Sequence, residues 1–265
     1  MDAIGAIWGM LSPSKFKAQK GEFKLSEVAR ENILQLQPYR CARDDYSEGI
    51  LLDANENSIG PAVATHPHLA LNRYPDPLHM DLKAEIAQLR KVDARQIFLG
   101  VGSDEAIDIL FRIFCNPRVD NVVVTPPTYG MYKVCAKVND VAVKSAPLTP
   151  EFDLDVPATL AAIDAHTKII FLCSPGNPTS KIIPCAAVEE ILYSYTSGVV
   201  VVDEAYIDFR CCRQSVVSCP LVCFLTLDIT HTHTSACLFL SSIARHLTLT
   251  SHPTCLATPR APAHW

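Results

Sequence analysis

The sequence predicts an α/β fold built on a largely parallel β-sheet. Between residues 96 and 210, short segments rich in valine and isoleucine alternate with longer segments whose apolar residues recur every three or four positions. This alternation is typical of repeated strand–helix units. The short segments are almost continuously apolar, as expected for strands that helices cover on both faces. With 265 residues and 49% hydrophobic composition, the chain can bury a substantial core.

Two helices are predicted before the alternation begins. The first spans residues 26–36, with Ser26 as its N-cap and Pro38 as its end. The second follows the proline turn RYPDP, and its apolar face consists of Leu78, Leu82, Ile86 and Leu89.

The alternating region is predicted to contain five strands separated by four helices. In chain order they are strand 97–99, helix 104–115, strand 122–125, helix 129–138, strand 141–145, helix 157–165, strand 168–173, helix 184–193 and strand 199–203.

The composition changes sharply at about Arg210. Residues 211–265 contain no lysine, glutamate or glycine, and glycine is the usual residue for helix C-caps and tight turns. We therefore expect three parts: an N-terminal arm and helix (1–48), an α/β domain (49–209), and an irregular, unrelated tail (210–265).

Charge and cysteine content narrow the function classes. A net charge of −5 and a pI near 6.0 disfavour binding to nucleic acid or to an anionic membrane. No apolar stretch reaches the ~18 residues that a membrane span requires. Asp2 precedes the first apolar run and the lysines follow it, which is unlike a signal peptide. The 11 scattered cysteines are then expected to be reduced, in a cytoplasmic protein that acts on a small molecule.

Ligands of open α/β sheets bind beyond the carboxyl ends of the strands. One such segment, GVGSDEAIDILFRIF, places Ser103, Asp104 and Glu105 at the start of a helix. Free N–H groups and the helix dipole favour a phosphate there, although simple helix capping by Ser103 explains the same residues.

Two further strand ends carry candidate ligand contacts. TPPTYGMY puts Tyr129 just beyond a rigid double-proline turn, where its ring could stack on a planar cofactor or simply pack in the core. CSPGNPTS holds the amide of Asn177 on a stiff loop that would also suit an ordinary turn.

The segment VVVVDEAYIDF is the most informative. It delivers Asp203 and Tyr206 from a buried strand, and a buried carboxylate is costly unless a cationic partner meets it. The protonated nitrogen of a pyridine ring would be such a partner, because protonation makes that ring an electron sink.

Together these segments resemble a known family. LLDANENSIGP, RYPDP, GSDEAIDILFR, PPTYGMY, SPGNPTS and VVDEAYIDF look like the histidinol-phosphate aminotransferases, which are fold-type I enzymes dependent on pyridoxal 5'-phosphate. LQPYRCARDDY resembles the lead-in of fungal members. The resemblance covers residues 26–209, and six linked motifs in register make chance an untenable explanation.

The resemblance implies roles for individual residues. Ser103, Asp104 and Glu105 would cradle the cofactor phosphate, and Tyr129 would stack on the pyridine ring. Asn177 and Tyr206 would bind its phenolic oxygen, and Asp203 its ring nitrogen. Nearer the substrate, the implied residues are Tyr74, which would reach the site of the partner in a homodimer, and Asn55, Glu56 and Asn57.

The resemblance also implies a reaction: exchange of an amino group between histidinol phosphate and 2-oxoglutarate, yielding glutamate, in histidine biosynthesis. The family's Schiff-base lysine should follow the DEAY motif, yet no lysine follows Lys181. A C-terminally truncated and inactive member is therefore expected, since Lys168 and Lys181 are poorly placed to substitute.

Three alternatives stay open. A related amino-acid aminotransferase or a phosphothreonine decarboxylase-like enzyme would share the cofactor residues. A non-catalytic fragment could pair with an intact subunit through Tyr74. A zinc-binding tail would use Cys219, Cys223, His231 and His233, whose spacing differs from that of the common zinc fingers.

Overall fold

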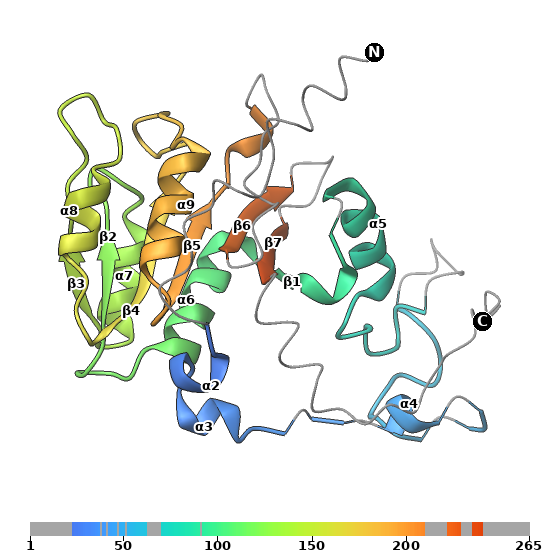
Figure 1. The fold of residues 1–265 in the computed structure, drawn as a ribbon. Helices are drawn as coiled ribbons and strands as arrows, with labels where there is room; N and C mark the ends of the chain where they lie inside the picture. Colours follow the sequence, from blue (N-terminus) through green and yellow to red (C-terminus); the bar gives the residue numbers. More distant parts are fainter. Residues whose placement is uncertain are drawn as a thin grey trace, which may run out of the picture.

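The chain folds around a sheet that carries helices on both sides (Figure 1). The computed structural model describes residues 23–37, 39–40, 42–46, 48–50, 52–62, 70–90, 92–209, 222–228 and 235–240. Within these ranges, no helix has the length and hydropathy needed to cross a lipid bilayer.

The described strands form one seven-stranded sheet in the order β1-β7-β6-β5-β4-β2-β3. Neighbours from β3 to β6 pair in parallel, whereas β7 runs antiparallel to both β6 and β1. The strands are β1 (Ile97–Gly100), β2 (Asn121–Val124), β3 (Ala142–Ser145), β4 (Thr167–Cys173), β5 (Val199–Asp203), β6 (Val222–Asp228) and β7 (Ser235–Leu240).

The helices after residue 78 lie close to their predicted positions. The helix predicted at 157–165 is shorter and ends already at Ala161. The described helices are α2 (Leu25–Val28), α3 (Glu31–Leu34), α4 (Ala42–Asp45), α5 (Met80–Arg90), η2 (Ala94–Gln96), α6 (Gly102–Phe114), α7 (Met131–Val138), α8 (Val156–Ala161), α9 (Cys185–Ser194) and η3 (Ile207–Phe209).

Successive residues of the central strands pack on opposite faces of the sheet, because side chains alternate along a strand. Val122 and Phe171 belong to a core that also contains apolar residues of α6 and α7. Val123 and Leu172 belong to the second core, with residues of α5 and α9. The prediction of strands covered on both faces is confirmed.

The helix predicted at 26–36 is wrong as a single element, because Arg30 interrupts it. Arg30 has an extended backbone, and its N–H donates to the carbonyl of Ile113 at 3.0 Å. Its guanidinium donates to the carbonyl of Arg112 at 2.8 Å. A cation at the carboxyl end of α6 is favourable, so this tertiary contact outweighs the local helical preference and leaves two short helices, α2 and α3.

Two segments of the tail depart from the expected irregularity. β6 adds to the sheet beside β5, pairing Val200 with Val222, and β7 connects β6 to β1. Both segments are rich in apolar residues and each contains a phenylalanine, and β6 adds the β-branched Val222 and Thr226; such residues suit strands beside a buried neighbour. For these segments, local β-propensity outweighs the compositional change at Arg210.

Candidate active site

The predicted cofactor residues gather at one edge of the sheet. β2, β4 and β5 are mutually parallel, so their carboxyl ends lie on the same side. β1 shares this direction, because two antiparallel pairings through β7 relate it to β6. Asp203 is the last residue of β5, and the segments that follow these four strands carry Ser103, Asp104, Glu105, Tyr129, Asn177 and Tyr206.

Asp203 is the most deeply buried of these residues, with 2% of its surface exposed. The Tyr132 hydroxyl donates to Oδ2 at 2.7 Å, and the N–H of Ala205 donates to Oδ1 at 3.1 Å. Among the described side chains, no lysine, arginine or histidine pairs with this carboxylate. Burial raises its pKa, and the two hydrogen bonds oppose that shift. The site thus presents a buried acid without a countercharge, which suits a cationic ligand.

Tyr132 was not predicted as a site residue. Its ring is fully buried and stacks on Phe171, with centroids 4.6 Å apart and planes 13° apart. It also meets the Tyr129 ring edge-on at 5.8 Å. The sequence did contain a signal: Tyr129 and Tyr132 are three residues apart in the helix predicted at 129–138, a spacing that places side chains on one face.

Tyr129 connects the α7 side of the site to α6. Its hydroxyl donates to Oδ1 of Asp104 at 3.0 Å. Burial and the nearby Asp104 carboxylate raise its pKa to about 12, so the phenol stays neutral at physiological pH. Ser103, the neighbour of Asp104 in the first turn of α6, is also buried. The structure therefore brings the predicted ring-stacking residue against the predicted phosphate cradle.

Glu105 stabilises the turn that precedes the same helix terminus. Its carboxylate accepts a hydrogen bond from the N–H of Val101, which holds the turn between β1 and α6. Gly102 adopts a positive φ of 72° in that turn, a conformation that disfavours residues with a side chain. The N–H groups of the first helical turn lack acceptors within an α-helix, so they remain suited to an anion.

Asn177 and Tyr206 share a surface pocket of about 330 Å³. Tyr206 is 44% exposed, and its ring lies 6.4 Å from that of Phe209. Asp208 fixes this segment to α5 through two hydrogen bonds from Arg90, at 2.8 and 2.6 Å. The other residues that line the pocket are Pro175, Gly176, Pro178, Ser180, Ile182 and Phe209.

One buried polar group near the site is unsatisfied. The hydroxyl of Thr128, which precedes Tyr129, has no hydrogen-bond partner among the described residues. A buried hydroxyl without a partner is costly, so a polar ligand would relieve it. The Thr128 hydroxyl, the Asp203 carboxylate without a cationic partner, and the first turn of α6 together suit a ligand that carries both a cationic ring and an anionic group.

Asn55, Asn57 and Tyr74 lie in a different place. Their segments run beside α5, away from α7 and β2 (Figure 1). Asn57 closes its own turn, accepting from the N–H of Ile59 at 3.1 Å and donating to the carbonyl of Gly60 at 2.6 Å. Within the described chain, no hydrogen bond joins these residues to Asp203 or Tyr129, and their substrate role stays a prediction.

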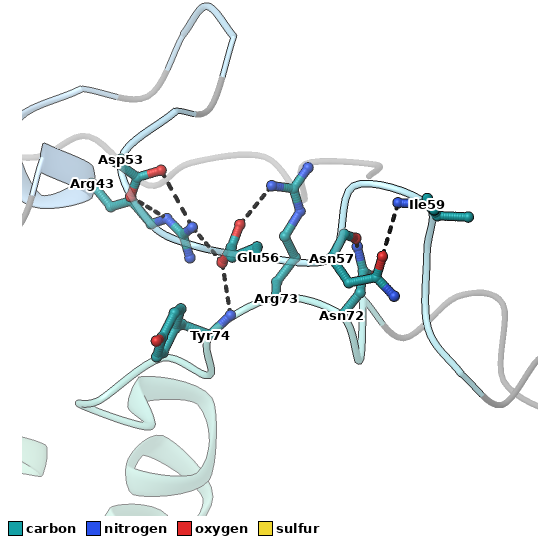
Figure 2. A network of polar contacts seen from close by, with 8 residues as sticks. All are labelled: Arg43, Asp53, Glu56, Asn57, Ile59, Asn72, Arg73 and Tyr74. Carbon is teal, nitrogen blue, oxygen red and sulfur yellow. Dashed lines mark hydrogen bonds and ion pairs between the residues drawn. The ribbon is translucent and has the colours of Figure 1, made fainter.

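Glu56 holds this second region together (Figure 2). Its side chain is only 5% exposed and accepts from Arg43 and Arg73, each at 2.6 Å. It also accepts from the N–H of Tyr74 at 2.8 Å. Arg73, Arg43 and that N–H lower the Glu56 pKa from 4.5 to about 2. Because the folded pKa is depressed, this contribution to stability is present above pH 4.5 and is lost as the pH falls through about 2.

Replacing Glu56 with glutamine should loosen this region. Glu56→Gln leaves Arg43 and Arg73 without the charge that they share, so both backbones should open more often. Tryptic cleavage after these two arginines, followed by mass spectrometry, should become about fivefold faster. Glu27→Gln, which removes the exposed pair with Lys24, is the control and should leave both rates unchanged. Equal rates in all three proteins would show that Glu56 does not hold the segment.

The alternative zinc site cannot be placed. Cys219, His231 and His233 lie outside the described residues, as does the side chain of Cys223. Elsewhere in the described chain, no cluster of three or more histidine, cysteine or acidic residues could hold a metal ion.

The fold matches those of solved aminotransferases. The chain superposes on a putative histidinol-phosphate aminotransferase from Erwinia carotovora atroseptica with a TM-score of 0.56, at 22% identity, over 72% of this chain and 61% of that one. A tyrosine aminotransferase from Leishmania infantum gives a TM-score of 0.56, at 18% identity, over 68% and 58% of the two chains. At these identities the likeness shows a shared fold.

Sequence comparison identifies the family. The histidinol-phosphate aminotransferase of Cytophaga hutchinsonii is 53% identical over 189 residues, covering 71% of this chain and 53% of the relative. That of Schizosaccharomyces pombe is 46% identical over 207 residues, covering 74% and 54%. The chain thus spans about half the length of the curated relatives it matches. The family model described as aminotransferase class I and II matches residues 47–243, which extends beyond Arg210. The chain therefore belongs to the class I and II aminotransferase family.

Proposed function

We propose that this chain is the cofactor-binding part of a histidinol-phosphate aminotransferase, and that it binds pyridoxal 5'-phosphate at the carboxyl ends of β1, β2, β4 and β5. The observation that carries the proposal is Asp203, a buried carboxylate with two neutral donors and no cationic partner among the described residues. The names of the curated relatives support the assignment of the reaction.

Each group of the cofactor has a candidate partner. Asp203 would bind the ring nitrogen and keep it protonated, and Tyr129 would stack on the ring. The first turn of α6, with Ser103 and Asp104, would hold the phosphate through backbone N–H groups. Asn177 and Tyr206 would bind the phenolic oxygen from the pocket that they line. The bound cofactor supplies an electron sink that stabilises negative charge at an amino carbon.

Three of the described lysines either lie far from these strand ends or pair with a carboxylate. Lys168 stands at the start of β4, roughly 16 Å from the carboxyl end at ~3.3 Å per residue. Lys181 pairs with Asp153 at 2.9 Å, and Lys144 pairs with Asp164 at 2.6 Å. No lysine follows Lys181 in the sequence. We infer that this chain, which lacks the lysine expected after the DEAY motif, holds the cofactor without a covalent bond and does not by itself transfer amino groups.

Partner and substrate assignments complete the proposal. Tyr74 is 62% exposed, which supports a role at a second subunit of a homodimer. Histidinol phosphate would be the amino donor and 2-oxoglutarate the acceptor, in the cytoplasm. An amino-acid aminotransferase or a phosphothreonine decarboxylase-like enzyme would share the cofactor contacts and differ in the donor.

The donor can be identified by binding. The absorbance of the cofactor-loaded chain should be titrated separately with histidinol phosphate, O-phosphothreonine and an amino acid without a phosphate. The proposal requires the tightest response to histidinol phosphate, and glutamate formation from 2-oxoglutarate no faster than with free cofactor. A tighter response to O-phosphothreonine would favour the decarboxylase-like alternative, and catalytic glutamate formation would refute the inferred inactivity.

A further inference from the structure

Tyr132 contacts two of the proposed cofactor residues, Asp203 and Tyr129. Its hydroxyl donates to Oδ2 of Asp203 at 2.7 Å, and its ring meets the edge of Tyr129 at 5.8 Å. No other described side chain donates a hydrogen bond to Asp203; the second donor is the backbone N–H of Ala205. The orientation of the carboxylate therefore depends on this phenol.

The packing of Tyr132 leaves it no alternative position. The side chain is completely buried and stacks on Phe171, itself a fully buried residue of β4, at 4.6 Å. Close packing on both sides restricts rotation of the ring, so the hydroxyl stays where it meets Asp203. A residue on β4, one on α7 and one on β5 thus fix the position of a single carboxylate oxygen.

The chemistry of the donor suits a site that awaits a cation. A lysine or arginine in this position would neutralise Asp203 and compete with a protonated ring for the carboxylate. A phenol stabilises the ionised carboxylate through a hydrogen bond and contributes no charge. A carboxylate offers about four acceptor positions on its two oxygens, so the donors Tyr132 and Ala205 leave others free.

We propose that Tyr132 is a positioning residue, whose hydroxyl fixes the Asp203 carboxylate in place for the ring nitrogen of pyridoxal 5'-phosphate. The inference rests on the proposed function, because it requires that the cofactor bind at Asp203. Tyr132 acts through Asp203 and does not itself touch the ring nitrogen. Its contact with Tyr129 also ties the stacking residue to the carboxylate, so both sit on one rigid support.

To separate the positioning role of Tyr132 from simple packing, the test compares protein variants and also two ligands that differ at the ring nitrogen. Tyr132→Phe keeps the ring and removes only the hydroxyl. Tyr195→Phe is the matched control: Tyr195 is 4% exposed and donates to the carbonyl of Thr167 at 2.7 Å, at the amino end of β4. Affinity should be measured by absorbance for pyridoxal 5'-phosphate and for its deaza analogue, in which carbon replaces the ring nitrogen.

The expected result is a loss that depends on the ring nitrogen. Tyr132→Phe should weaken binding of pyridoxal 5'-phosphate about tenfold and leave the affinity for the deaza analogue within about twofold of wild type. Tyr195→Phe should change neither affinity. Equal losses for both ligands, or no loss, would overturn the positioning role while leaving the proposed function intact.

Two further outcomes are also decisive. If the unmodified chain binds neither ligand, the proposed function fails and the inference fails with it. If Tyr132→Phe does not fold, 3-fluorotyrosine placed at position 132 retains the shape and makes the hydroxyl a stronger donor. It should change the affinity for pyridoxal 5'-phosphate and not that for the deaza analogue. Equal affinities in the fluorinated and unmodified chains would overturn the inference.

Discussion

Replacing Asp203 with asparagine should weaken pyridoxal 5'-phosphate binding by about 100-fold, because the protonated ring nitrogen loses its only proposed anionic partner. Asparagine keeps the size of the side chain and an oxygen that can accept from Tyr132. The loss should therefore come from the missing charge, without a cavity. Absorbance titration measures the affinity, with Asp153→Asn as a surface control that should bind like wild type. An unchanged affinity in Asp203→Asn would show that the cofactor does not use this carboxylate.

The same substitution should stabilise the cofactor-free chain. Burial raises the Asp203 pKa above its ordinary value of 3.8, so the folded chain retains this proton to higher pH than the unfolded chain does. Its contribution to stability is then greatest at low pH and declines as the pH rises from 3.8 through the raised pKa. Other titratable groups that interact with it are Tyr132, Cys173, Asp104 and Tyr129.

Urea unfolding across this pH range can detect the effect. Wild type should lose stability with rising pH relative to Asp203→Asn, and the two curves should converge at acid pH. Equal pH dependence in the two proteins would mean that burial of this carboxylate carries no cost. If Asp203→Asn is more stable than wild type and binds the cofactor more weakly, Asp203 serves ligand binding and lowers the stability of the fold.

Gly198→Ala should be the most destabilising single substitution of those considered. A Cβ atom at Gly198 would lie 1.8 Å from the Tyr195 hydroxyl and 2.5 Å from the Lys168 carbonyl oxygen. Tyr195 cannot move aside without losing its buried hydrogen bond to Thr167. Overpacking and the broken bond together should cost roughly 3 kcal/mol or more.

Gly130→Ala provides the matched control for this prediction. Gly130 has helical backbone angles, and an added Cβ would meet nothing within 4 Å. Its unfolding free energy should stay within about 0.5 kcal/mol of wild type. If Gly198→Ala unfolds at the same urea concentration as Gly130→Ala, the close approach between Gly198 and Tyr195 is not a constraint in solution.

Much of the sheet was predictable because its strands are short, valine- and isoleucine-rich segments that can be recognised in the sequence. The valine-rich segment at Val199–Asp203 has no competing helical period, and its predicted bounds are those of the structure. The motif at Gly102 likewise marks a strand-to-helix turn through glycine and acidic residues. The close relation of Asp203, Tyr129 and Asp104 followed from the rule that parallel strands share one binding edge.

Several features of the structure were not predicted because they depend on contacts between residues far apart in the sequence. The break at Arg30 arises because the carboxyl end of α6 offers acceptors 82 residues further along the chain. Tyr132 looks like a core residue until Asp203 is seen beside it. Single hydrogen bonds in the Glu56 network join residues up to 18 positions apart, with no periodic pattern. β6 and β7 lie in a tail whose overall composition obscures the strand-forming character of these two short segments.

We propose that these strand ends bind pyridoxal 5'-phosphate without a covalent bond. The most direct measurement is an absorbance titration of the purified chain with the cofactor, before and after borohydride, with mass spectrometry to locate any fixed lysine adduct. We expect saturable, stoichiometric binding that dialysis reverses, and no lysine modified in stoichiometric yield. A single lysine labelled stoichiometrically, or no saturable binding at all, would contradict it.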